Sequence, residues 1–283
     1  MDIFVHIPRT GGQTISQLFV QNYEMKRTIF CGGAYDEVVR LRDATPADMS
    51  AAIGHFPINV LNHGAGPRRR VTMLRDPEAR HESEYHFHRN TEGSLYPDVS
   101  LHQWLDERYV VQPGRLILQN MQVRFVSGAF VWSDCDDMAL ARAIENLCRM
   151  SAFGLQERFE ESVLMFGRAF DWQHIFYVPT NKKTPGKPAL SMQQADKTPQ
   201  KLPFLALDRA LFAFGQTLFA DRVARLGQLF QDALGQYREG LSALAGEYSD
   251  YLETTTGYNA DRELVAHLRS IPLPPAVERF FGS

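Results

Sequence analysis

Short apolar runs alternate with longer amphipathic segments along the first two thirds of the chain. Runs with the length and apolar content of buried strands lie at 3–7, 51–56, 70–74, 152–155 and 174–178. Segments with helical spacing of apolar residues lie at 12–23, 76–88, 100–108, 115–126, 136–149 and 157–170. Strands that alternate with helices predict an α/β fold with a mostly parallel central sheet.

The last third of the chain has a different pattern. Residues 179–203 are rich in Pro, Lys, Thr and Gln and predict a long loop. An apolar stripe at helical spacing follows from 207 to about 248, and we interpret it as core packing, with a dimer seam as the alternative. We therefore expect a core at 1–205 and a helical C-terminal extension at 206–283 packed on it, in a single domain overall.

Composition restricts the class of protein. The chain has 283 residues and a net charge of −3, whereas a general nucleic-acid binder is usually basic. Its three cysteines are widely spaced without a CxxC pair, which favours neither a zinc site nor a disulfide framework. No signal-peptide pattern and no run of about 20 apolar residues is visible. We expect a soluble cytoplasmic protein with no membrane span and no nucleic-acid partner; the oligomeric state is unknown.

The first strand runs directly into the segment HIPRTGGQT and a helix. Glycines let backbone N–H groups approach a ligand, and a helix N-terminus favours an anion. Arg9 adds a cation that can grip two oxygens. A phosphate or sulfate site is expected here; a tight turn without ligand is the alternative. The lysine spacing of a nucleotide-binding P-loop is absent. The candidate ligand-binding residues are Arg9, Thr10, Gly11, Gly12, Gln13 and Thr14.

A second strand-to-helix junction has the sequence LRDPEARHES. Arg75 follows the carboxyl end of a strand, where open α/β sheets bind ligands. Arg80 and Ser83 lie on the helix that follows, so the three residues could hold a second phosphate. Alternatively, Asp76 only caps this helix and the arginines pair with neighbouring glutamates.

These two segments resemble the phosphate-binding motifs of sulfotransferases that use 3′-phosphoadenosine 5′-phosphosulfate (PAPS). HIPRTGGQT resembles their 5′-phosphosulfate loop, and LRDPEARHESEY resembles their 3′-phosphate motif, RDPxxRxxSxY. The segments IGHFP, NMQVR and SAFGLQERFEESVLMF, in that order along the chain, resemble the Golgi-type carbohydrate subgroup. This subgroup includes the heparan sulfate 2-O-sulfotransferases, and its bacterial relatives are similar. The resemblance covers 3–180, and the tail beyond about 205 matches only loosely.

The resemblance implies a P-loop-like three-layer α/β/α fold and a sulfotransferase with PAPS as donor and 3′-phosphoadenosine 5′-phosphate (PAP) as product. The acceptor is expected to be a hydroxyl of a carbohydrate or glycoconjugate, with no metal required. The absence of an anchor suggests a bacterial relative. His55 is the candidate catalytic base, since a histidine titrates near neutral pH; a core histidine at a strand end is the alternative. Arg9 stands where the family usually has lysine, and we expect it to act in catalysis as an electrostatic clamp.

Further candidate binding residues are named from their place along the chain relative to the motifs. Lys182, Lys183 and Thr184 lie where relatives close over the nucleotide, so they are candidates for cofactor binding. Arg124 and His86 are candidates for acceptor binding. His81 and His88 are interpreted as surface or acceptor-side residues. The run 68–70 (three arginines) is interpreted as a solvated strand entry, with an anionic acceptor as the alternative.

Two other functions remain open at this point. One is a P-loop-type nucleotide kinase, against which the missing lysine spacing and the lack of an evident Mg²⁺-binding acidic motif both count. The other is a non-catalytic module that binds a nucleotide, a glycan or a protein, which the arginine at position 9 favours. Among acceptors, tyrosine or a small metabolite is an alternative to a carbohydrate.

Overall fold

The computed structural model describes most of the chain. The described residues are 1–32, 35–45, 47–62, 68–90, 100, 103–104, 106, 119–129, 134–178, 202–247 and 262–283. Most of the predicted helix at 100–108, the start of the one at 115–126 and nearly all of the predicted loop at 179–203 lie outside these residues. Lys182, Lys183 and Thr184 lie outside them as well.

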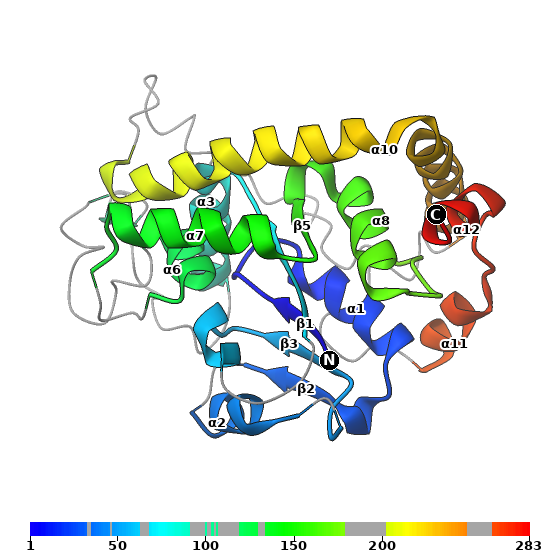
Figure 1. Cartoon of the computed structure of the whole chain (residues 1–283), viewed down its shortest axis with the longest axis horizontal. Coiled ribbons are helices and arrows are strands. Elements are labelled where there is room, and N and C mark those ends of the chain that lie inside the picture. The colour runs from blue at the N-terminus through cyan, green and yellow to red at the C-terminus, as the bar shows by residue number, and fades with distance from the viewer. Residues whose placement is uncertain are drawn as a thin grey trace.

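A five-stranded sheet forms the centre of the molecule (Figure 1). Its strands are β1 (Asp2–Val5), β2 (Thr28–Cys31), β3 (Ala51–Gly54), β4 (Arg69–Leu74) and β5 (Ala152–Leu155). The strand order is β2-β3-β1-β4-β5, and all four pairings are parallel. The predicted α/β fold with a parallel central sheet is confirmed.

The strands are buried along almost their whole length, which explains why their sequences read as short apolar runs. All four residues of β1, β3 and β5 are buried. Strands covered by helices on both faces have this continuous apolar character rather than alternation. The register pairs Val5 of β1 with Gly54 of β3 and with Thr72 of β4, so these strands end close together at one edge.

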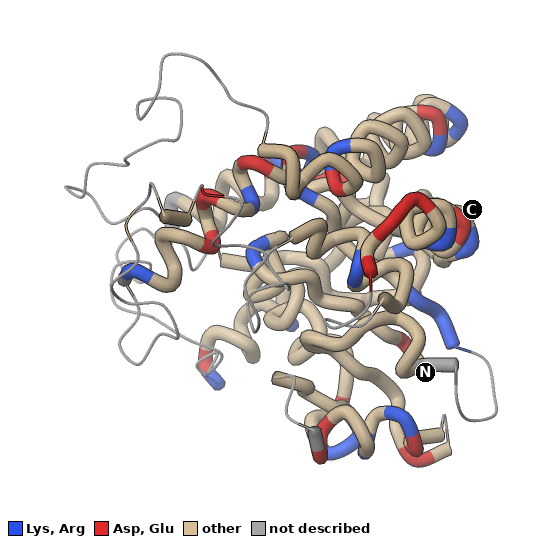
Figure 2. The backbone as a smooth tube through the Cα atoms, turned by 90° about the vertical axis from the view of Figure 1, so that its left-hand side faces the viewer, with Lys and Arg blue, Asp and Glu red and all other residues tan. Residues whose placement is uncertain are grey.

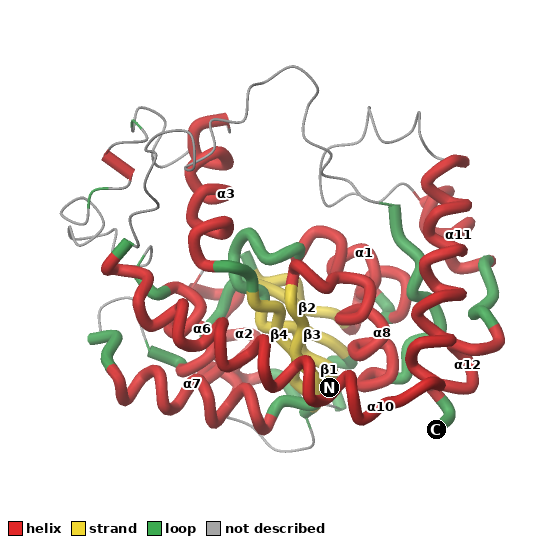
Figure 3. Tube along the Cα trace, turned by 90° about the horizontal axis from the view of Figure 1, so that it is seen from above, coloured by secondary structure: helices red, strands yellow, loops and turns green. Residues whose placement is uncertain are grey.

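Helices cover both faces of the sheet. In Figure 3, α1 and α8 lie on one side of the strands and α2, α6 and α7 on the other. The helices are α1 (Gly12–Asn22), α2 (Tyr35–Asp43), α3 (Pro77–Asn90), α6 (Met121–Ser127), α7 (Asp137–Arg149), α8 (Phe159–Phe170), α10 (Ala206–Glu247), α11 (Arg262–Ser270) and α12 (Pro275–Phe281). Short 3-10 turns lie at Met25–Arg27, Ile58–Asn62, Gln156–Arg158 and Pro203–Leu205.

The long helix α10 runs across the β5 side of the molecule, over α7 and α8 (Figure 1). A break in its helical geometry occurs at Gly227, where φ is 64° and ψ is −155°. Leu211, Phe219 and Phe230 of the predicted stripe are buried in the core. Core packing therefore accounts for the stripe. The helical C-terminal region is confirmed, whereas the domain boundary near residue 205 stays a prediction.

The predicted strand at 174–178 is wrong, because this extended segment pairs with side chains instead of a strand. The carbonyls of His174, Ile175 and Phe176 accept hydrogen bonds from Asn22, Tyr237 and Gln21, respectively, at 2.7, 2.8 and 3.1 Å. Side chains of α1 and α10 thus satisfy the backbone that a neighbouring strand would otherwise pair with.

Two elements, β2 and α2, were not among those predicted from the sequence. The strand β2 comes directly after the charged turn Met25–Arg27 and lies at the end of the strand order, paired on one side only. It is recognisable only by its pairing with β3.

Buried polar side chains join α10 to α6. The amide oxygen of Asn120 accepts from the N–H groups of Leu207 and Asp208, both at 3.1 Å. The carboxylate of Asp208 accepts in return from Gln122 N and Val123 N at 3.2 and 2.8 Å. Asp208 is fully buried, and this burial raises the pKa of its carboxyl to about 6. The contact fixes the first turn of α6.

Replacement of Asp208 by alanine is expected to lower the free energy of unfolding by about 3 kcal/mol. Two buried N–H groups would lose their acceptor, and each such loss costs about 1–3 kcal/mol. The measurement is urea unfolding of Asp208→Ala beside Asp221→Ala, which removes an exposed aspartate of the same helix. The control is expected to change stability by less than about 0.5 kcal/mol. Equal effects of the two substitutions would contradict the proposed importance of this contact.

Candidate active site

The carboxyl ends of the central strands bring the predicted residues His55 and Arg75 to one edge of the sheet, together with His6, which was not predicted. His6 follows β1, His55 follows β3 and Arg75 follows β4. Backbone hydrogen bonds extend the pairing beyond β1, since His6 N donates to Gly54 O at 2.9 Å. The two strand-to-helix junctions of the sequence therefore lie side by side, as expected for ligand-binding loops in an open α/β sheet.

The turn between β1 and α1 leaves the N-terminus of the helix available to an anion. Gly11 is the N-cap residue, with φ at 89° and no side-chain cap, and the first turn contains no acidic residue. A Cβ atom on Gly11 would lie 2.3 Å from Gln156 Oε1, and one on Gly12 would lie 1.8 Å from His6 Nε2. Only glycine fits at these two positions, and the resulting turn has the form of a phosphate or sulfate cradle.

The side chains predicted in this turn occupy different positions. Thr10 is fully buried, and its hydroxyl donates to Ile7 O at 2.8 Å, which closes the turn. Gln13 and Thr14 lie half-buried in the first turn of α1. Arg9 has a left-handed backbone with φ at 68°, an uncommon conformation for a residue with a side chain.

Arg9 connects the first junction to the second. Its Nε donates to Ser83 Oγ of α3 at 3.1 Å, and its guanidinium lies 4.9 Å from the centre of the Phe87 ring. In the opposite direction, Arg75 Nη1 donates to Arg9 O at 2.9 Å. The residues predicted to hold two separate phosphates thus form one connected cluster.

This cluster carries more positive charge than its partners neutralise. Arg80 is fully buried and pairs with Glu84 at 3.2 Å, yet its Nε and Nη2 atoms have no hydrogen-bond partner among the described residues. Burial lowers the pKa of Arg9 and of Arg75 below the ordinary arginine value, and the charge of Arg80 lowers both further. Buried donors without partners are costly, so the arrangement fits an anion that the arginines would share.

Gln122 holds Arg75 at the end of β4. Its Oε1 accepts from Arg75 N at 2.9 Å, and its Nε2 donates to Arg75 O at 2.8 Å. The helix cap expected of Asp76 is present, because Asp76 Oδ1 accepts from Ala79 N at 2.8 Å. The sequence marked Gln122 only as part of a motif; its role depends on a contact between α6 and β4 that no local pattern shows.

His55 is half-buried and fixed by its neighbour on β1. Its Nδ1 lies 2.9 Å from His6 O, and the two imidazole rings are 4.3 Å apart. A carbonyl only accepts hydrogen bonds, so Nδ1 carries the proton and Nε2 is left as the basic atom. Burial lowers the pKa of His55 below its ordinary 6.5. At neutral pH His55 is therefore an uncharged imidazole, which is the form a general base needs.

The acceptor-side candidates, Arg124 and His86, lie on α6 and α3. Arg124 is only 4% exposed and donates to Gln119 O at 3.0 Å. His86 Nε2 lies 3.8 Å from Glu82 Oε1 on the same helix. Their roles in acceptor binding, and those of Lys182, Lys183 and Thr184 in cofactor binding, stay predictions.

The interpretation of His81 as a surface or acceptor-side residue is wrong. Its side chain is fully buried between Trp104 and Phe204, each 5.2 Å away between ring centres. Its Nε2 lies 3.2 Å from Trp104 O, and burial lowers the pKa of His81 to about 3. His88, by contrast, is half-buried and lies 3.1 Å from Glu84 Oε1.

The arginine run at 68–70 lies at the opposite edge of the sheet. Arg69 pairs with both carboxylate oxygens of Asp2, at 2.7 and 2.8 Å, and Arg68 donates to Ala44 O at 2.8 Å. The contact of Arg69 with Asp2 binds the amino ends of β1 and β4 together. Arg69 thus has a structural role at the edge away from the candidate site.

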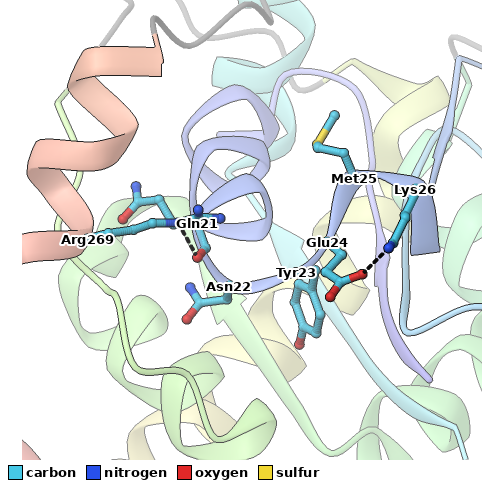
Figure 4. A pocket seen from close by; sticks show the side chains of 7 residues that line it. All are labelled: Gln21, Asn22, Tyr23, Glu24, Met25, Lys26 and Arg269. Carbon is cyan, nitrogen blue, oxygen red and sulfur yellow. Dashed lines mark hydrogen bonds and ion pairs between the residues drawn. The ribbon is translucent and has the colours of Figure 1, made fainter.

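A surface hollow of about 550 Å³ also lies at that opposite edge, between the end of α1, the turn Met25–Arg27 and Arg269 of α11 (Figure 4). Arg269 donates to the carbonyls of Val20 and Gln21 at 2.8 and 2.9 Å and so caps the end of α1. Lys26 pairs with Glu24 at 3.4 Å. The charged groups of the hollow are therefore engaged with the protein itself.

Comparison with known proteins identifies a relative with a sulfotransferase name. The chain is 24% identical to heparan-sulfate 6-O-sulfotransferase 3-B of Danio rerio, in an alignment that covers 78% of this chain and 64% of the relative. The resemblance to PAPS-dependent carbohydrate sulfotransferases is confirmed. The similarity to this named enzyme extends over most of the present chain.

The name of that relative differs from the subgroup of carbohydrate sulfotransferases expected from the sequence motifs. Its name specifies 6-O-sulfation, so the likeness to the 2-O subgroup stays a prediction. The chain spans less than two thirds of the relative's length, and no protein-family model matches it. Within the described part of the chain, no helix is both long and apolar enough to span a membrane.

Replacement of Gly12 by alanine is expected to reduce the free energy of unfolding by about 1–3 kcal/mol, because the new methyl group would overlap the His6 ring. Chemical denaturation measures the effect. Gly235→Ala is the matched control, since that glycine lies in α10 with nothing within 4 Å of an added Cβ. The control is expected to raise stability by up to about 1 kcal/mol. A stable Gly12→Ala protein would mean that the turn does not require the close contact with His6.

Proposed function

We propose that this protein transfers a sulfuryl group from PAPS to a hydroxyl group of a carbohydrate or glycoconjugate. The observation that carries the proposal is the single cluster formed by Arg9, Arg75, Arg80 and Ser83 beside the uncapped N-terminus of α1. The similarity to a named sulfotransferase supports the same reaction class.

The residues present fit a nucleotide with phosphate groups at two positions. The turn from Arg9 to Thr14 would hold the 5′-phosphosulfate through backbone N–H groups and the Arg9 guanidinium. Arg75, Arg80 and Ser83 would hold the 3′-phosphate, and the unpartnered Nε and Nη2 atoms of Arg80 are donors suited to it. Bound PAPS would supply the sulfuryl group and leave as PAP.

The protein's own groups account for the rest of the chemistry. His55 takes the proton of the acceptor hydroxyl at Nε2 as the acceptor oxygen bonds to sulfur. Arg9 stabilises the negative charge that appears on the phosphate oxygen when its bond to sulfur breaks. Arginine keeps its proton, so Arg9 acts here by charge and hydrogen bonding and not as a general acid. Positioning and charge stabilisation dominate catalysis in transfers of this type.

The acceptor is proposed at the level of its class. The name of the relative points to a polysaccharide, so heparan-type chains are the first acceptors to test. Lysine, arginine, aspartate and glutamate are interspersed over the described backbone in Figure 2. This mixture fits a neutral or moderately charged glycan better than a densely sulfated polymer. A cytoplasmic location, a bacterial source and a core at 1–205 remain parts of the same proposal.

Isothermal titration with PAP tests the nucleotide site. The protein is expected to bind PAP more tightly than ATP or AMP. Arg75→Ala is expected to weaken PAP binding at least about tenfold, since a hydrogen bond to a charged group contributes about 1.5–3 kcal/mol. Arg225→Ala removes an exposed arginine of α10 and is the control. Equal affinity for PAP and ATP would favour a nucleotide kinase, and no binding of either would exclude a nucleotide site.

Replacement of His55 by alanine tests the base. The kcat for PAP release in the presence of an acceptor is expected to fall by about 100-fold or more, the usual contribution of a general base. PAP affinity is expected to stay within about threefold, because His55 contributes no charge to the arginine cluster at neutral pH. The control is His174→Ala, whose histidine is near neither junction. A His55→Ala enzyme with nearly full turnover would contradict the assignment, and PAP binding without turnover in the unmutated protein would favour a non-catalytic module.

A further inference from the structure

His6 has no role in the proposed reaction so far, although it lies in the middle of the site. Its side chain is 6% exposed. The ring stacks on Phe4 at 5.6 Å with an interplanar angle of 19°, and its centre is 4.3 Å from that of the His55 ring. The backbone of Gly12 lies so close to the ring that an added Cβ would be 1.8 Å from Nε2. The ring is therefore confined by three different elements.

His6 also contacts His55 through its backbone. The His6 carbonyl is the acceptor for His55 Nδ1 at 2.9 Å. The ring contact and the hydrogen bond together restrict the rotation of the His55 imidazole, since one fixes a face of the ring and the other fixes an edge. Because the carbonyl can only accept, the proton of the neutral His55 ring lies on Nδ1, and Nε2 is the atom that can take up another proton.

We propose that His6 is a positioning residue for His55, holding its imidazole in a single orientation and tautomer with Nε2 as the basic atom. The inference rests on the proposed function, in which that atom accepts the proton of the acceptor hydroxyl. His6 itself does not touch the reacting atoms in this role.

The charges around His6 and His55 favour His55 as the residue of the pair that accepts a proton. Burial lowers the pKa of His6 well below its ordinary value, and the charges of His55 and Arg9 lower it further. The hydrogen bond to the His6 carbonyl raises the pKa of His55, as does the charge of Glu84, and both oppose the effect of burial. When His55 takes a proton, its neighbour therefore stays neutral and does not compete for it.

Loss of the His6 ring would remove the cover over one face of His55. Water would then reach the imidazole, its charged form would become easier to make, and its pKa would rise toward 6.5. The hydrogen bond to the backbone carbonyl would remain available, but the ring would no longer be held against it.

The first experiment is a ¹H–¹⁵N NMR titration of the histidine side chains in the protein without nucleotide or acceptor. His55 in the unmutated protein is expected to show the Nδ1–H tautomer and a pKa below 6.5. In His6→Ala the pKa of His55 is expected to rise toward 6.5 and the signals of both tautomers to appear. An Nε2–H tautomer in the unmutated protein overturns the proposal, and so does an unchanged His55 in His6→Ala.

Two further variants of the protein complete the comparison. His174→Ala is the matched control, a histidine substitution remote from the site that is expected to leave the His55 signals unchanged. His6→Asn serves if His6→Ala does not fold, since it also removes the ring but leaves a smaller gap, and the same shift is expected of it. Because no substrate is needed, these results decide the role of His6 even if the protein proves not to be a sulfotransferase.

Activity provides a separate readout where turnover is observed. The acid limb of the pH profile of kcat/KM is expected to move to higher pH in His6→Ala. With a base of pKa near 6.5, kcat/KM at about pH 5.5 is expected to be about tenfold below its plateau, whereas the unmutated enzyme keeps more of its activity there. A uniform loss at every pH, with no shift of the limb, overturns the positioning role. Absence of turnover in the unmutated enzyme counts against the proposed function alone.

Discussion

The candidate site depends on the close packing of the His6 ring against the backbone of Gly12. This contact sets where α1 begins relative to the end of β1, because no side chain can stand between the ring and the helix. The first N–H groups of α1 receive no side-chain cap. The pairing of β1 with β3 continues at His6 and places its carbonyl opposite His55, so the start of α1 and the His55 imidazole both lie at the carboxyl edge of the sheet.

The charge of the site follows from a second constraint, the burial of several arginines around one short loop. The carbonyls of the loop accept from Arg75 and Arg80, so the second junction also shapes the first. Glu84 and Glu157 offset part of this positive charge. Burial of like charges lowers the stability of a protein unless a partner of opposite charge is present. The arginine cluster is therefore costly to the fold by itself and suited to an anion as partner.

A buried polar network behind the site connects it to the helical C-terminal region. Asn120 and Asp208 fix the first turn of α6 on α10. The side chain of Gln122, in the same turn, forms hydrogen bonds with both the N–H and the carbonyl of Arg75. The position of the second arginine junction therefore depends on a helix more than 120 residues further along the chain. This dependence gives the C-terminal helix a part in the site although it contributes no candidate ligand.

The sequence by itself determined the features that local chemistry controls. Short apolar runs predicted four of the five parallel strands, the glycines at 11 and 12 predicted the turn into α1, and Asp76 predicted a helix cap. Local patterns failed where a partner distant in sequence decides the outcome. The segment at 174–178 is extended but pairs with side chains, β2 exists through its pairing with β3, and His81 is buried by Trp104 and Phe204.

The roles of His6 and Gln122 likewise appear only in the tertiary structure. A histidine just after a strand or a glutamine in a helix has no local signature of what it contacts. The parallel register brings His6 and His55 together across 49 residues, and the packing of α6 brings Gln122 to Arg75 across 47. The sequence supplied the reactive groups, while the folded structure decided their orientation, burial and charge, because these properties depend on neighbours that only long-range packing provides.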